Sequence, residues 1–215
     1  MKIKSAIVLV MLMALVISVA SLFYLEDTIP IHFGANGKPD QFGSKYFVLV
    51  FSGIIGALGS TMLLVVQLGK VTENYKKYLL RTCFLSELFF TAILIAFIYY
   101  ARYYTQSDGF DISKVVMPLL GILLIAMGNY FPKIKRNRTL GIRCKWTLYN
   151  ETTWQKSHRF GGFVFVIDGV LTLLCGIFLD TIVSCLMLIG LLTASITVIS
   201  IAAYRIYKEE RNGGR

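Results

Sequence analysis

Uncharged, mostly apolar residues fill six long segments of the chain, and short polar segments separate them. A bilayer core needs about 20 apolar residues in helical form, with roughly 17 to 25 tolerated. Helices are required because a backbone exposed to lipid must satisfy its own hydrogen bonds. Inside the six segments the only charges are Glu87 and Asp168. The pattern predicts an all-α integral membrane protein, one membrane domain over residues 1–215, with spans at about 5–25, 46–69, 82–101, 115–132, 160–179 and 181–204.

The charges indicate how this domain is oriented. Charged residues make up 16% of the chain, against about 25% in soluble domains. If the N-terminus is cytoplasmic, the inside segments are 1–4, 70–81, 133–159 and 205–215, and they hold 18 of the 22 Lys and Arg residues. The positive-inside bias therefore predicts that both termini are cytoplasmic. The net charge of +10 is then a topology signal, and we expect no direct binding of nucleic acid.

The predicted outside loop, residues 26–45, is patterned. Ile29–Phe33 alternates like a short strand, and Pro30 confines it to an edge or a start. Asn36-Gly37 and Pro39-Asp40 are typical of turns, and Ser44 suits the N-cap of the second helix. Two interpretations stay open, a surface that contacts an outside molecule or a compact cap on the helix ends.

A metal site in this loop is a weaker alternative. His32 could bind a metal together with Asp40, Glu26 or Asp27, but the spacing matches no ligand pattern. We therefore expect no metal and no cofactor.

The predicted inside loop, residues 133–159, is basic and aromatic, which suits the inner headgroup layer. Pro132 is placed to end the fourth helix, and Asn150 to cap a short helix that carries Trp154 into the fifth span. Lipid anchoring does not explain the ordered Gly141-Ile142-Arg143 and Trp146-Thr147-Leu148. We therefore expect a shaped cytoplasmic surface that contacts the helix bundle or a protein partner.

Polar residues inside the spans are the remaining candidates. A charge at bilayer depth costs roughly 2.5 kcal/mol or more, so it usually faces the bundle and has a partner. Glu87 and Asn129 fall toward the cytoplasmic ends of their spans, where Glu87 could reach His158, Arg159 or Arg143. Asp168 falls near the middle of the fifth span, without a basic partner at its depth. A proton or cation relay and a neutral hydrogen-bonding role both remain possible.

Two further patterns bear on packing and on catalysis. Ser52, Gly56 and Ser60 recur every four residues, which allows close helix approach within the monomer or across a homodimer.

The sequence has no HExxH, CxxC, Gly-x-Ser-x-Gly or phosphate-binding glycine loop. We therefore expect that the protein is not an enzyme.

The two patterned loops resemble the SdpI family of bacterial membrane proteins, which provide immunity to secreted killing peptides. The outside motif is matched by Ile29, Pro30, His32, Phe33, Gly37, Pro39, Asp40, Ser44 and Lys45. The inside motif is matched by Gly128, Asn129, Tyr130, Pro132, Lys133, Lys135, Asn137, Gly141, Ile142, Arg143, Trp146, Thr147, Leu148, Trp154, His158 and Arg159. The chain departs from the family pattern at Gly34, Arg136 and Cys144-Lys145.

This resemblance implies a membrane immunity protein of the bacterial cell membrane that binds a secreted peptide toxin without catalysis. Toxin-binding candidates are His32, Phe33, Pro39 and Asp40. The inside structure, and the dock for a cytoplasmic transcriptional repressor, would be organised by Asn129, Arg143, Trp146, Trp154, His158 and Arg159. Membrane lipids are further expected partners. The rival hypothesis is a small proton- or cation-coupled transporter that uses Glu87 and Asp168.

Overall fold

The computed structural model describes residues 3–34, 36–69, 73–104, 111–137 and 140–213. Within them it contains six helices that are long and apolar enough to cross a membrane, which confirms the predicted all-α membrane fold. The helices are α1 (Ile3–Ser21), α2 (Val48–Leu68), α3 (Glu73–Tyr103), α4 (Ser113–Tyr130), α5 (Glu151–Phe178) and α6 (Thr181–Gly213). The orientation of the termini stays a prediction.

Three helices extend beyond the predicted spans. Helix α3 begins at Glu73 rather than near residue 82, α5 begins at Glu151, and α6 continues to Gly213. The added turns are rich in Lys, Arg and Glu, which lower hydropathy but are good helix formers. The first charged residues therefore indicate where an apolar span ends, but the helix itself continues beyond them.

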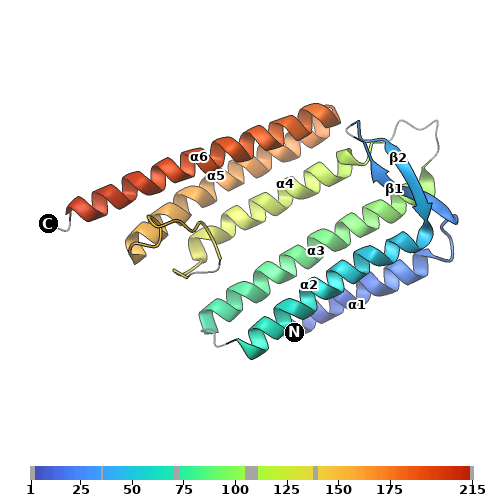
Figure 1. Ribbon diagram of the computed structural model, residues 1–215, viewed down its shortest axis with the longest axis horizontal. Coiled ribbons are helices and arrows are strands. Elements are labelled where there is room, and N and C mark those ends of the chain that lie inside the picture. The colour runs from blue at the N-terminus through green and yellow to red at the C-terminus, as the bar shows by residue number, and fades with distance from the viewer. Residues whose placement is uncertain (1–2, 35, 70–72, 105–110, 138–139, 214–215) are drawn as a thin grey trace.

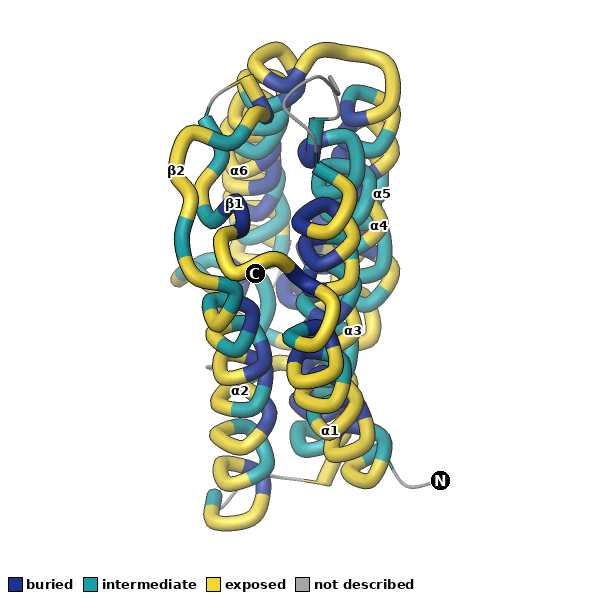
Figure 2. The backbone as a smooth tube through the Cα atoms, turned by 90° about the vertical axis from the view of Figure 1, so that its right-hand side faces the viewer, coloured by how far each residue is buried: buried dark blue, intermediate teal, exposed yellow. Residues whose placement is uncertain are grey.

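The helices form two halves that lie side by side (Figure 1). Helices α1, α2 and α3 pack on one another, and α5 packs on both α4 and α6. The halves meet mainly along α3 and α4. Many large apolar residues are exposed, among them Phe163 (64% exposed) and Ile196 (65%). Figure 2 shows in yellow how exposed residues recur along the helices. Such outward faces suit lipid and not water.

Glycines bring α4 and α5 unusually close together. A Cβ atom on Gly128 would lie 2.6 Å from the Gly162 carbonyl oxygen, and one on Gly121 would lie 2.6 Å from that of Gly169. Such contacts are tighter than real Cβ atoms allow, so only glycine fits there. By contrast, a Cβ on Gly56 would meet nothing within 4 Å. Close helix approach at Gly56 within the monomer is therefore wrong for the described residues, and it occurs between α4 and α5; the homodimer alternative stays a prediction.

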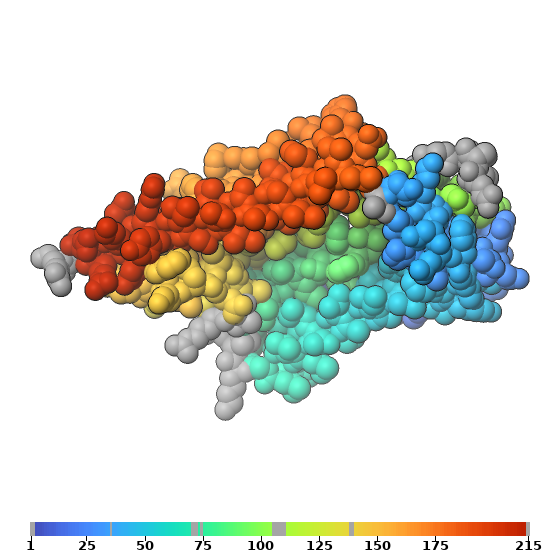
Figure 3. Space-filling model, turned by 45° about the horizontal axis from the view of Figure 1, so that its top comes forward, coloured from blue at the N-terminus to red at the C-terminus, as the bar shows by residue number. Residues whose placement is uncertain are grey.

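A β-hairpin covers one end of the bundle, called here the hairpin end. Strands β1 (Thr28–Phe33) and β2 (Pro39–Ser44) pair antiparallel. Gly37, at φ +72°, lies in the turn between them, and Ser44 caps the short 3₁₀ helix Lys45–Phe47 that leads into α2. The strand at Ile29–Phe33 was predicted, but Pro39 and Asp40 begin a second strand and do not form a turn. Figure 3 shows the hairpin beside the N-terminal end of α6.

Candidate functional sites at the two ends of the bundle

The hairpin presents an exposed acid–imidazole pair. His32 Nδ1 lies 2.6 Å from Asp40 Oδ1, and their side chains are 59% and 50% exposed. Phe33 points the other way, with its ring edge-on to Phe97 and Tyr100 at centroid distances of 6.4 and 5.1 Å. The four hairpin candidates therefore separate by face. His32 and Asp40 face outward, and Phe33, with its strand partner Pro39, anchors the cap.

The same end holds a clamp that sequence reasoning missed, centred on Asp111. A Cβ atom on Gly37 would overlap the Asp111 carboxylate, so this carboxylate lies directly against the hairpin turn. Asp111 Oδ1 accepts the backbone N–H of Ser113 at 2.8 Å, and Oδ2 accepts the hydroxyl of Thr181. The Ser113 and Thr181 hydroxyls lie 2.6 Å apart. Asp111 thus joins the hairpin to the N-terminal ends of α4 and α6.

The hairpin does not gather a metal site. Among the described residues, no three His, Cys, Asp or Glu side chains are placed to hold a metal ion. Asp27, one of the possible ligands considered with His32, pairs instead with Lys45 at 2.9 Å.

At the opposite end of the bundle, called here the loop end, Trp154 anchors the segment between α4 and α5. Its side chain is completely buried, and its indole Nε1 donates to the Ile134 carbonyl at 2.6 Å. The indole stacks on the His158 ring, with centroids 3.9 Å apart and planes 23° apart. Trp154 therefore ties the start of the loop to the first turns of α5.

His158 fixes the next part of the loop through both ring nitrogens. Its Nε2 accepts the backbone N–H of Ile142 at 3.0 Å, and its Nδ1 donates to the Trp154 carbonyl at 2.9 Å. An Nε2 atom that accepts must be unprotonated, so these contacts select the neutral Nδ1–H tautomer. Gly141 has φ +96°, and a Cβ there would overlap the His158 ring. His158 thus explains the glycine at position 141 and holds the backbone of the residue that follows it.

Hydroxyl and amide side chains close the remainder of the loop. The Thr147 hydroxyl donates to the Ile142 carbonyl at 2.9 Å and accepts the Cys144 N–H at 3.1 Å. Asn150 caps α5 as predicted, accepting the Thr153 N–H at 2.7 Å, and the Thr153 hydroxyl completes a capping box. Residue identity at these positions is therefore explained by folding of the loop itself.

The loop also docks on the last turns of α6. Trp146 packs edge-on against Tyr204 at 5.3 Å, and Tyr149 does the same against Tyr207 at 5.0 Å. Lys156 of α5 pairs with Glu210 at 2.7 Å. The α6 partners come some 50 residues after the loop and carry no local sequence signal.

Other inside candidates lie outside this network of buried contacts. Asn129 is exposed, and its Nδ2 donates to the Ile125 carbonyl of its own helix at 3.0 Å. Arg143 and Arg159 are exposed on the surface of the loop end. Arg136, at a position where the chain departs from the family pattern, contacts the Leu148 carbonyl at 3.1 Å and the Glu151 carboxylate at 3.6 Å.

The two intramembrane carboxylates lie in different halves. Glu87 is 2% exposed, and its Oε1 atom faces Gly59 of α2, where a Cβ would lie 2.8 Å away. The expected contact of Glu87 with His158, Arg159 or Arg143 is therefore wrong. It failed because α3 begins at Glu73 and places Glu87 near its middle.

Asp168 is 3% exposed on α5 and lies within hydrogen-bonding reach of Ser195 on α6. One carboxylate oxygen of each residue, Glu87 Oε2 and Asp168 Oδ2, has no hydrogen-bond partner among the described residues.

Comparisons with known proteins match both patterned segments. A family model described as the SdpI/YfhL protein family matches residues 133–204, and one described as a domain of unknown function (DUF1648) matches residues 9–56. The immunity protein SdpI of Bacillus subtilis (strain 168) is 28% identical over 197 residues, which cover 89% of this chain and 89% of that protein. No solved structure matches the chain. The first match holds the loop-end network, and the second includes the hairpin.

Proposed function

We propose that the chain, which matches a model of the SdpI/YfhL family over residues 133–204 and is a multi-pass protein of the bacterial cell membrane, is an immunity protein that binds a secreted killing peptide at the membrane. The observation that carries this proposal is the exposed His32–Asp40 pair, held on a hairpin directly above the helix ends. The similarity to an immunity protein over 89% of both chains supports the same function.

The hairpin surface suits an amphipathic or apolar peptide. Beside the His32–Asp40 pair, Phe42 is 47% exposed and Tyr46 is 60% exposed. Aromatic side chains are frequent at binding surfaces, and a Tyr, with an apolar ring and a polar hydroxyl, is typical of membrane interfaces. A peptide entering the outer leaflet would meet these rings and the His32–Asp40 pair together.

The side chains favour binding over catalysis. Both ring nitrogens of His158 are committed to backbone groups, so this imidazole has no free position to act as a base. The exposed His32 has the Asp40 carboxylate as its partner. General-base catalysis on a nucleophile needs a third group within hydrogen-bond reach.

A cytoplasmic repressor that docks on the loop end is the second part of the proposal. Exposed basic residues gather there, namely Lys133, Lys135, Arg136, Arg143, Lys145 and Arg159. The buried network holds the backbone beneath them in one shape, so a partner with an acidic surface would meet a fixed pattern of cations. Capture of a cytoplasmic regulator should fail when Arg143 and Lys145 become Glu; unchanged capture would reject this surface as its dock.

The transporter alternative has a weaker basis. Glu87 and Asp168 are buried with unpartnered oxygens, as an ion pathway would require. They lie, however, in different three-helix halves, and Glu87 faces α2 while Asp168 faces α6. Proton- or cation-dependent flux in proteoliposomes that disappears in Asp168→Asn would support a transporter over the immunity function.

Survival tests the proposed function. A toxin-sensitive strain expressing the chain would be challenged with killing peptides from the producer and its neighbours, while membrane potential is recorded. Protection with a preserved potential is expected. No protection against any peptide, despite confirmed membrane insertion, would reject the proposal.

A further inference from the structure

The seam between the two halves contains an elongated apolar space. At the loop end, a cavity of about 110 Å³ lies between α3, α4 and the loop. A second space of about 190 Å³ follows along the same two helices, lined by residues that include Phe89, Ile122 and Ala126. Leu85 and Leu123 line both, so the two spaces lie next to each other along the seam, and together they are called here the groove.

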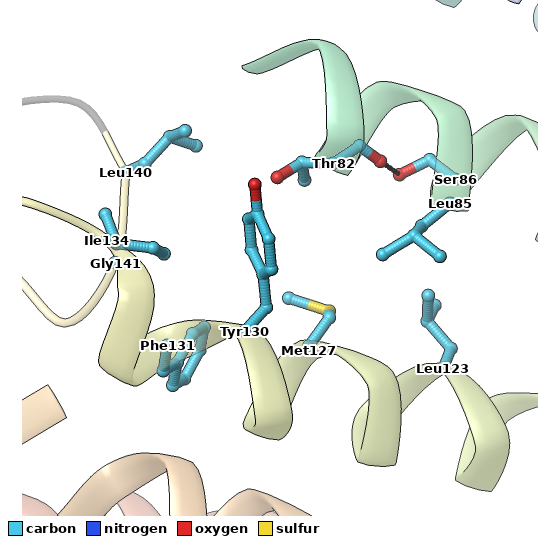
Figure 4. Close-up of a pocket in the computed structure, with 10 residues that line it drawn as sticks. All are labelled: Thr82, Leu85, Ser86, Leu123, Met127, Tyr130, Phe131, Ile134, Leu140 and Gly141. Atoms are coloured by element: carbon cyan, nitrogen blue, oxygen red, sulfur yellow. Dashed lines mark hydrogen bonds between the residues drawn. The ribbon is translucent and has the colours of Figure 1, made fainter. Parts of the chain in front are cut away.

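The loop end of this groove is polar. Figure 4 shows the Tyr130 side chain reaching from α4 toward Thr82 of α3. The Tyr130 hydroxyl is buried and has no well-formed hydrogen bond, although the exposed Arg81 lies close enough to interact with it electrostatically. Tyr78 packs edge-on against Tyr130 at 5.6 Å. The groove thus has an apolar length and an end that offers a hydroxyl and a cation.

The dimensions and the depth of the groove limit what can occupy it. An apolar cavity of about 150 Å³ accepts a molecule as small as benzene. A flexible hydrocarbon chain fits both spaces in succession, and the seam lies at the depth where lipid tails surround the protein.

We propose that the α3–α4 seam is a binding site for an anionic phospholipid of the leaflet at the loop end. One acyl chain lies along Leu85 and Leu123, and the phosphate meets Arg81 and the Tyr130 hydroxyl. Lys and Arg side chains next to spans attract anionic headgroups. The lipid supplies the apolar contacts that the two halves lack along this seam.

The site also reaches the loop-end network. Leu140 and Gly141 form part of the wall of the cavity at the loop end. Gly141 lies against the His158 ring, and the Ile142 N–H donates to that ring. A lipid in the seam therefore supports the loop from the side opposite to α5.

Native mass spectrometry of the delipidated full chain, titrated with phosphatidylglycerol or phosphatidylcholine, tests the proposal. Arg81→Gln should lower the affinity for phosphatidylglycerol roughly fivefold and remove the preference over phosphatidylcholine. Ala126→Leu, which fills the groove, should reduce binding of both lipids. Arg102→Gln removes the same charge at the other end of α3, and Ala57→Leu adds the same bulk on an exposed face of α2; both should bind as the wild type does.

Thermal stability provides a second readout. A ligand that binds only the folded state raises Tm, so phosphatidylglycerol should raise the Tm of the wild type and raise that of Ala126→Leu far less. Binding and lipid-induced Tm shifts in Arg81→Gln and Ala126→Leu equal to those of their controls would overturn the proposal.

Discussion

The imidazole of His158 accepts the backbone N–H of Ile142 at 3.0 Å, sixteen residues away along the chain. Through this bond a side chain near the start of α5 holds the loop in place and pairs a backbone N–H that would otherwise have no acceptor. The same ring stacks on Trp154 and excludes any side chain at Gly141. One buried ring thus contacts two separate parts of the inside motif, Gly141-Ile142 and Trp154.

Replacing His158 by Phe should destabilise the loop. The ring volume is retained, but the Ile142 N–H loses its acceptor, and a buried unsatisfied donor costs about 1–3 kcal/mol. We expect a lower Tm and faster hydrogen exchange of the Ile142 amide. The control is Arg159→Ala, because the adjacent Arg159 is exposed. Exchange at Ile142 that is as slow as in the wild type would contradict the assigned hydrogen bond.

Gly141→Ala should be strongly destabilising for a related reason. The residue has φ +96°, where side chains are strained, and the added methyl would overlap the His158 ring. Strain of this kind costs about 1–3 kcal/mol before the overlap is counted. Gly190→Ala is the matched control, since its Cβ would meet nothing within 4 Å and helix propensity favours Ala by about 0.5–1 kcal/mol. The two substitutions should therefore move Tm in opposite directions, and equal shifts would refute the assignment.

The α4–α5 contact gives a further prediction. Gly128→Ala places a methyl group against the Gly162 carbonyl oxygen, so the helices must separate and lose packing along their length. We expect a loss of about 1–3 kcal/mol, as for other overpacked cores, seen as a lower Tm in detergent. Gly56→Ala should be neutral, because the site is open. A destabilised Gly56→Ala with an intact Gly128→Ala would restore the packing face suggested by the sequence.

Gly128 and Gly56 show which features of the fold can be predicted from the sequence and which cannot. The helices, the strand at Ile29 and the Asn150 cap follow from patterns within a few residues, and each was predictable. The glycines of α4 and α5 are spaced seven apart, and their meaning depends on a partner helix that no local pattern identifies. The Asp111–Thr181 contact likewise joins residues 70 positions apart.

Asp111→Ala should loosen the hairpin end. It removes the acceptor for the Ser113 N–H and the Thr181 hydroxyl, and hydrogen bonds to a charged group contribute about 1.5–3 kcal/mol. The expected results are a lower Tm and faster proteolysis of the hairpin. Glu26→Ala removes the same charge from an exposed position at the same end. Equal proteolysis of the two variants would argue against the clamp.

The hairpin candidates should differ in what they change. His32→Ala combined with Asp40→Ala should reduce survival in the presence of the toxin. The free energy of unfolding should change by no more than about 0.5 kcal/mol, as for exposed positions. Phe33→Ala should lower Tm by removing the ring packed on Phe97 and Tyr100. If the double variant still protects the cells, the peptide-binding surface does not include this pair.

Site-specific photocrosslinking in intact cells tests peptide binding at the hairpin most directly. A photoreactive residue would replace His32 or, as a lipid-facing control, Leu186, which is 64% exposed on α6, and cells would then be challenged with the killing peptide. The account predicts a one-to-one adduct of intact peptide through position 32, none through position 186, and protection in proportion to the adduct. Full protection with no adduct at position 32, or with cleaved peptide, would contradict it.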